Sequence, residues 1–263
     1  MQPVETLPTR PLPVENRWCI HAYYTNNSSA PDGSGRLVIY GYDMDADAGE
    51  VLVLGPDGEV QQRFGRGPVN TSYFHTGRWQ AWSPDARYVY YQRGPIMEPE
   101  IVRHELATGE EVSIDGDMEM MPPDGEPLLC TLTGMNYAAG HGDHVYRPDA
   151  APFPFQARDQ HGIFRYTFSP NNRELALSVA EVLEQHPQRD ALIQADRELQ
   201  AQHGANDGLT LMLYAVRYST DGQRILIFFG NHTVSSCVPE RGEPRIGSVF
   251  TANRDLSDLR MAV

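Results

Sequence analysis

The sequence has 263 residues, 40% hydrophobic and 21% charged, and is long enough to form the core of one large domain or two small ones. Its 35 acidic residues outnumber its 21 basic ones. The net charge of −14 argues against a general nucleic-acid-binding or membrane-surface protein, because both need a broad basic surface. Every basic residue is arginine, which excludes Schiff-base chemistry and phosphate-binding loops that need the lysine amine.

Residues 1–17 are predicted to be an N-terminal extension of a folded domain at 18–263. They contain no apolar core of signal-peptide length, and no window of the sequence approaches the roughly 20 apolar residues of a membrane span. We therefore expect a cytoplasmic protein, and a periplasmic one if a leader has been removed. The three cysteines, Cys19, Cys130 and Cys237, are too far apart for a disulfide framework or a metal knuckle.

One short pattern recurs along the chain: a small or aromatic residue, a Pro-Asp-Gly-like turn and an alternating apolar run. Proline sets φ at the first turn position, and Asp, Asn or Gly tolerate the left-handed one. The alternating run is typical of a half-buried strand. Each copy therefore predicts a strand, a tight turn and a second strand. The copies are SAPDGSGRLVIY (Ser29–Tyr40), WSPDARYVYY (Trp82–Tyr91), FSPNNRELAL (Phe168–Leu177) and YSTDGQRILIF (Tyr218–Phe228).

The spacing of these turns matches the four strands of a propeller blade. The turn positions are Pro31, Pro84, Pro170 and Thr220, at intervals of 53, 86 and 50 residues. The longest interval is either one blade with an insertion or nearly two blades with one degenerate motif. Two further hairpins are expected at Gly49–Phe64 and Glu100–Ile114. We predict an all-β fold, a β-propeller of four-stranded antiparallel blades, with about five blades in this chain.

The stretch Val179–His203 interrupts the β pattern. It is rich in helix formers and is broken by Pro187, so it predicts a helical insertion of two short helices between blade strands. Loops of this kind cap one face of a propeller and shape its cleft, and a purely structural flap is the alternative.

The Pro-Asp repeats resemble those of TolB-like propellers. Longer strings resemble the propeller polysaccharide lyases, the group of oligogalacturonate and ulvan lyases, over most of the chain from Trp18 onward. These strings are HAYYTNNSSAPDG, YFHTGRWQAWSPD, YAAGHG, PFQARDQHGIFRYTFSP and GNHTVSS. The resemblance implies a seven-bladed propeller that is longer than this chain, so we expect an incomplete propeller here rather than a closed five-bladed ring.

The resemblance also implies a carbon–oxygen lyase that cleaves uronic-acid-containing oligosaccharides by β-elimination. A base removes the proton α to the sugar carboxylate, and the oxygen at C4 leaves. Arginine or a metal ion must neutralise the carboxylate, while His or Tyr serves as acid and base. An acidic oligosaccharide is then the expected partner. The alternative is a non-catalytic TolB-like propeller that binds a protein or a carbohydrate ligand.

Four residues are the predicted catalytic set under this resemblance. His75 precedes a strand pair at the place where innermost strands meet a central cleft, and Tyr137 lies in a string of small residues that lets the backbone approach a ligand. Arg158 and His161 would provide the carboxylate clamp and a second titrating group. The structural alternatives are a histidine bonded within a turn, a packed tyrosine and an Arg158–Asp159 surface pair.

The predicted substrate-binding residues are His21, Asn26 and Arg78. His21 occupies the position in the first blade that His75 occupies in the second, Asn26 offers an amide for sugar hydroxyls, and Arg78 follows His75 by three residues.

A divalent metal ion, Mn or Zn, is the expected cofactor, if there is one. Histidine is the commonest protein ligand for such ions, and His232 is the predicted ligand. His141, His144 and Cys237 are the other options in the sequence.

Overall fold

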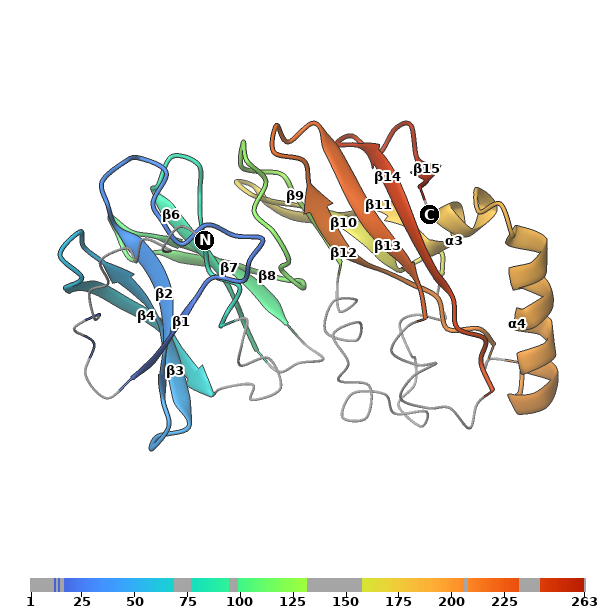
Figure 1. Cartoon of the computed structure of the whole chain (residues 1–263), viewed down its shortest axis with the longest axis horizontal. Coiled ribbons are helices and arrows are strands. Elements are labelled where there is room, and N and C mark those ends of the chain that lie inside the picture. Colours follow the sequence, from blue (N-terminus) through green and yellow to red (C-terminus); the bar gives the residue numbers. More distant parts are fainter. Residues whose placement is uncertain are drawn as a thin grey trace, which may run out of the picture.

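The computed structural model describes residues 12, 14, 17–68, 77–94, 99–131, 158–205, 208–231 and 242–262. In this part of the chain the backbone forms four antiparallel sheets and two helices (Figure 1). The first sheet contains β1 (Trp18–His21), β2 (Leu37–Asp43), β3 (Ala48–Leu54) and β4 (Val60–Pro68). The second contains β5 (Ala81–Trp82), β6 (Tyr88–Arg93), β7 (Glu100–Glu105) and β8 (Glu111–Asp115). The third contains β9 (Leu128–Cys130), β10 (Gly162–Phe168) and β11 (Asn171–Ser178). The fourth contains β12 (Met212–Tyr218), β13 (Arg224–Gly230), β14 (Gly247–Asn253) and β15 (Arg260–Met261).

Each sheet is a meander in which the strand order follows the chain order. Repeated antiparallel meanders of about four strands are the blades of a β-propeller, so the predicted fold class is confirmed. The described residues contain four such sheets, where the sequence predicted about five blades.

The Pro-Asp turns join neighbouring strands as predicted. In the second sheet the Ser83 hydroxyl donates to the Asp85 carboxylate at 2.6 Å, and the backbone N–H of Arg87 donates to the same carboxylate at 3.1 Å. Ser219 and Asp221 repeat this contact in the fourth sheet, also at 2.6 Å. The carboxylate satisfies turn donors that have no partner in the strand ladder, which explains why the motif recurs between strands.

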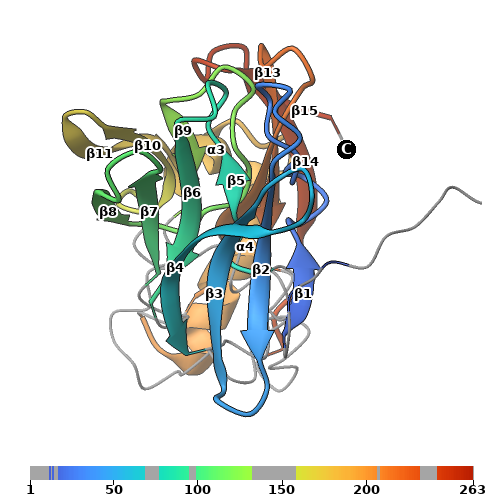
Figure 2. The same ribbon diagram turned by 90° about the vertical axis from the view of Figure 1, so that its left-hand side faces the viewer.

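Neighbouring sheets face one another (Figure 2), and buried apolar side chains pack between them. One buried cluster, with Val51 and Tyr91, joins the first and second sheets, and another, with Ile101 and Tyr166, joins the second and third. A third cluster around Phe229 joins the third and fourth sheets to the helices. Each such side chain contributes about 1.5–3 kcal/mol when fully buried, so face-to-face packing of the sheets is the main source of stability.

Two helices, α3 (Val179–Glu184) and α4 (Arg189–His203), occupy the stretch where a helical insertion was predicted. The N-cap of α3 is a capping box: Ser178 accepts from the backbone N–H of Glu181 at 3.1 Å, and the Glu181 carboxylate accepts from the Ser178 N–H at 2.7 Å. α4 lies at the end of the molecule farthest from the first sheet (Figure 1). Neither helix, nor any other in the described ranges, is long and apolar enough to cross a membrane.

Candidate functional site

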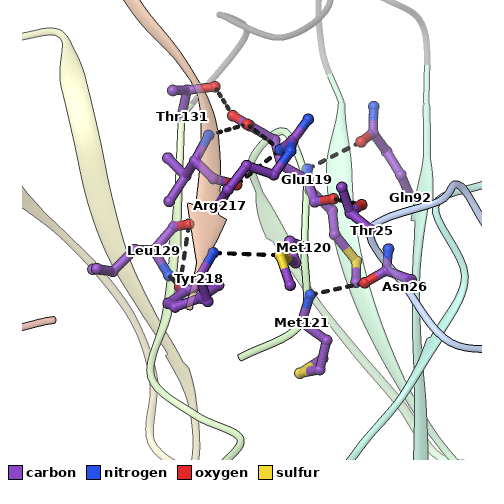
Figure 3. Close-up of polar contacts among 12 residues, drawn as sticks. Thr25, Asn26, Gln92, Glu119, Met120, Met121, Leu129, Thr131, Arg217 and Tyr218 are labelled. Carbon is purple, nitrogen blue, oxygen red and sulfur yellow. Dashed lines mark hydrogen bonds and ion pairs between the residues drawn. The ribbon is translucent and has the colours of Figure 1, made fainter. Parts of the chain in front are cut away.

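The segment at residues 117–121, between the second and third sheets in the chain, is hydrogen-bonded to strands of two sheets and to the chain next to strands of the other two (Figure 3). Its backbone and the side chain of Glu119 make these contacts. The partners are Thr25 in the loop after β1, Gln92 on β6, Thr131 directly after β9 and Val216 on β12. We call this stretch the 117–121 segment. It thus connects β6 and β12 with the chain that follows β1 and β9.

Glu119 is fully buried in the middle of this segment. Its carboxylate accepts from the backbone N–H of Val216, from the Thr131 hydroxyl at 3.1 Å and from the Arg217 guanidinium at 3.3 Å. Burial disfavours the charged form and raises the pKa of Glu119 to about 6, against the opposing effect of Arg217. The carboxyl group therefore titrates close to neutral pH.

Arg217 also lines a pocket of about 360 Å³, which we call the aromatic pocket. Tyr23 and Tyr24 reach it from the loop after β1, and the other lining residues belong to β12 and β13. The rings of Tyr214 and Phe228 stack with centroids 5.5 Å apart, and those of Tyr23 and Tyr24 lie 4.2 Å apart. The full lining is Tyr23, Tyr24, Tyr214, Ala215, Arg217, Leu226 and Phe228. The pocket thus combines flat apolar surfaces with one guanidinium group.

A β-bulge in β12 brings Tyr214 and Arg217 into the same pocket. In a regular strand, residues three apart point to opposite faces. Here Tyr214 pairs with Phe228 and Arg217 pairs with Leu226, so β12 contains one residue more than β13 over this stretch. The extra residue is accommodated by Ala215, which has a φ of 57°.

Two guanidinium groups act on the tyrosines of the pocket. Burial and the Tyr24 hydroxyl raise the pKa of Tyr23, while Arg217 lowers it. Burial raises the pKa of Tyr214, and Arg245 opposes that shift. Two arginines therefore act on the pocket tyrosines, in a chain whose net charge is −14.

Three of the residues predicted from the sequence, His75, Tyr137 and His232, lie outside the described residues, as do His141, His144 and Cys237. Their roles stay predictions. Among the residues that the structure does describe, no group of three or more His, Cys, Asp or Glu side chains could hold a metal ion.

The predicted substrate-binding residues lie in the first two sheets and their connections. The Asn26 side-chain oxygen accepts from the backbone N–H of Met121 at 3.0 Å, so Asn26 lies against the 117–121 segment. Arg78 donates to the carbonyl oxygen of Pro68 at 2.7 Å. His21 is exposed at the end of β1. Of the three, Asn26 is the one that contacts the 117–121 segment directly.

Arg158 and His161 lie in a different neighbourhood, beside the helices. Arg158 makes a two-point ion pair with Asp196 of α4, at 2.7 and 3.3 Å, and donates to the carbonyl oxygen of Leu209 at 2.6 Å. The partner is thus Asp196 rather than the adjacent Asp159. His161 is 2% exposed, and burial lowers its pKa to about 4. These contacts connect Arg158 to α4 and place His161 in the interior.

The residues that form the aromatic pocket were not among the site residues predicted from the sequence. The available signal was a charged residue within an apolar string, as for Glu119 in DMEMM and Arg217 in LYAVRY. Charged residues are almost never fully buried unless they are paired, so such positions predict a partner. The partner itself comes from a distant part of the chain.

Comparison with known proteins supports the fold. No protein-family model matches this chain, and no curated protein matches it. A solved structure assigned as TolB from Agrobacterium tumefaciens matches 92% of this chain and 67% of its own, with 13% sequence identity and a TM-score of 0.50. At this identity the likeness shows a shared TolB-like β-propeller fold and nothing finer.

Two other solved structures are more distant. TolB from Acinetobacter baumannii is matched over 90% of this chain at 11% identity and a TM-score of 0.46, and this chain spans 42% of its length. An oligogalacturonate lyase in complex with manganese is matched over 92% of this chain and 65% of its own, at 12% identity and a TM-score of 0.37.

Proposed function

We propose that this β-propeller binds an acidic oligosaccharide in the aromatic pocket. The observation that carries the proposal is the combination of four aromatic rings with the Arg217 guanidinium around one hollow of about 360 Å³. Ligand sites are typically apolar and aromatic with a few polar groups that fix orientation. Aromatic faces suit the C–H surface of a sugar ring, and a planar guanidinium matches a carboxylate in two-point geometry.

Charge supports an acidic rather than a neutral sugar as the ligand. A chain with a net charge of −14 repels anions at long range, so an anionic ligand needs local positive charge. Arg217 is 17% exposed and paired on its inner side, and Arg245 is close enough to act on Tyr214. Long-range repulsion is screened within about 8–10 Å at physiological salt, whereas a contact inside a pocket is screened less.

The test is calorimetric titration of trigalacturonate into the purified chain. Arg217→Ala should weaken binding by about tenfold or more, the value of one lost contact to a charged group. Tyr214→Ala should weaken it by about tenfold as well, because it removes an aromatic face. Matched controls are Trp18→Ala and Arg260→Ala, which remove a 63% exposed aromatic ring and a 73% exposed arginine elsewhere. Equal affinity of the pocket variants and the native chain would overturn the proposal.

A second candidate function is β-elimination in the same pocket, as the resemblance to the propeller lyases suggests. The observation in its favour is that the Tyr23 phenol and Arg217 line one pocket. The guanidinium would neutralise the uronate carboxylate, and a tyrosine whose pKa is raised stays protonated and suits donation to the leaving oxygen. The sequence-predicted His75 or Tyr137 would act as base.

Ultraviolet absorbance separates the two candidates, because elimination creates a conjugated double bond. Lyase activity requires turnover by the native chain, with a loss of about 10²–10⁴-fold in His75→Ala and in Tyr23→Phe. A chelator should reduce turnover only if an ion held by His232 takes part. Binding without any product favours the binding propeller.

A further inference from the structure

The aromatic pocket has a buried carboxylate directly behind its arginine. Glu119 contacts Arg217 at 3.3 Å, and its side chain is 0% exposed while that of Arg217 is 17% exposed (Figure 3). Glu119 is therefore the buried member of this ion pair, and Arg217, which lines the pocket, is the more exposed one. Its Nη1 also donates to the carbonyl oxygen of Val216 at 2.8 Å, which keeps it in this position.

A ligand carboxylate in the pocket would give Arg217 two anionic partners. When Glu119 is ionised, the Glu119–Arg217 pair has no net charge. A second carboxylate beside Arg217 would add a negative charge that this pair does not compensate, in a site of low dielectric constant, where the repulsion between like charges is strong. Two carboxylates that share a site cannot both stay ionised without cost, and the usual result is that one of them binds a proton.

We propose that Glu119 takes up one proton from solvent when an acidic ligand binds to Arg217, so that ligand and proton bind together. The inference rests on the function proposed above. In this step the protein with an ionised Glu119 binds one ligand carboxylate and one proton. The product is a complex in which the Glu119 carboxyl group is neutral and the ligand carboxylate is ionised. Arg217 keeps its own proton throughout, and its charge then compensates the ligand.

The surroundings of Glu119 allow this carboxyl group to accept the proton. Tyr218 on β12 and Cys130 on β9 face it, and burial raises the pKa of both well above the ordinary value, so both stay neutral near pH 7. Asp117, in the same segment, acts on the same Cys130 thiol and adds to the negative charge. The contacts from the loop after β1 and from β6 come from Thr25 and Gln92, which are uncharged.

The raised pKa of Glu119 allows proton uptake to accompany ligand binding near neutral pH. Because its pKa is about 6, the Glu119 carboxyl group is mostly ionised at pH 7 in the free protein, so it can bind one proton when the ligand binds. For one linked proton, the affinity for the acidic ligand should fall about tenfold from pH 6.5 to pH 7.5.

The test is calorimetry with trigalacturonate at pH 7 in two buffers of different ionisation enthalpy. The difference in apparent binding enthalpy gives the protons taken up. We expect close to one proton per ligand for the native chain, none for Glu119→Gln, and none when the native chain binds the methyl ester of the same sugar. Glu50→Gln is the matched control, because Glu50 is also buried and bonded to an arginine, Arg63, at 2.8 Å in the first sheet.

The outcomes distinguish this inference from the proposed function. Binding of the acid by the native chain with no proton uptake, or uptake that persists in a folded Glu119→Gln variant, would overturn the inference and leave the binding site intact. No binding by the native chain would overturn both. The comparison of acid and methyl ester needs no variant, so it decides the question even if Glu119→Gln does not fold.

Discussion

Replacing His161 by glutamine should remove much of the acid sensitivity of the fold. The imidazole is 2% exposed, and burial lowers its pKa from an ordinary 6.5 to about 4. Between these values the unfolded chain binds a proton that the folded chain does not, so stability is lost as the pH falls from about 6.5 to 4. The difference of about 2.5 pKa units corresponds to about 3 kcal/mol.

Urea unfolding at pH 7.5 and pH 4.5 measures this effect. The native chain should lose about 2–3 kcal/mol more free energy of unfolding on acidification than His161→Gln. His21→Gln replaces an exposed histidine and is the control, with an acid loss equal to that of the native chain. An acid loss in His161→Gln as steep as in the native chain would refute the assignment of His161 as a buried neutral imidazole.

Three further predictions follow from other buried contacts. Burial raises the pKa of Glu119 to about 6, so its contribution to the free energy of unfolding is full below about pH 4.5 and is lost as the pH rises through about 6. The native chain should therefore lose about 2 kcal/mol across this range, and Glu119→Gln should remove that loss when urea unfolding is measured at both ends of it. Arg158→Ala should destabilise the fold by about 2 kcal/mol, because it leaves the Asp196 carboxylate without its two-point partner; a melting temperature equal to the native one would contradict this. Ser178→Ala should cost about 1 kcal/mol by removing the N-cap of α3, detected as a lower urea midpoint, and Ser178→Thr should restore most of it.

The propeller could be predicted from the sequence because its signals are local. A Pro-Asp turn needs only residues that are neighbours in the chain, as the contact between Ser83 and Asp85 shows. Strand alternation and the break at Pro187 are likewise local. The number of sheets was harder to predict, because the interval between the second and third copies of the motif allowed either one blade or two.

The candidate site could not be predicted in the same way, because it depends on contacts between distant parts of the chain. Arg217 and Glu119 are 98 positions apart, and the bulge at Ala215 reverses the side that alternation assigns to Arg217. The partner of Arg158 also comes from a distant part of the chain. The structure pairs Arg158 with Asp196 on α4, 38 positions away, and the ligand contact that the family resemblance implies for it stays a prediction.

The central claim is that the aromatic pocket binds the carboxylate of an acidic sugar through Arg217. The most direct measurement is a crystal structure of the chain with trigalacturonate at a concentration that saturates binding. We predict a sugar ring against Tyr214 or Tyr23, with a carboxylate within hydrogen-bonding distance of the Arg217 guanidinium. A sugar bound elsewhere on the molecule, with the aromatic pocket free of ligand, would contradict it.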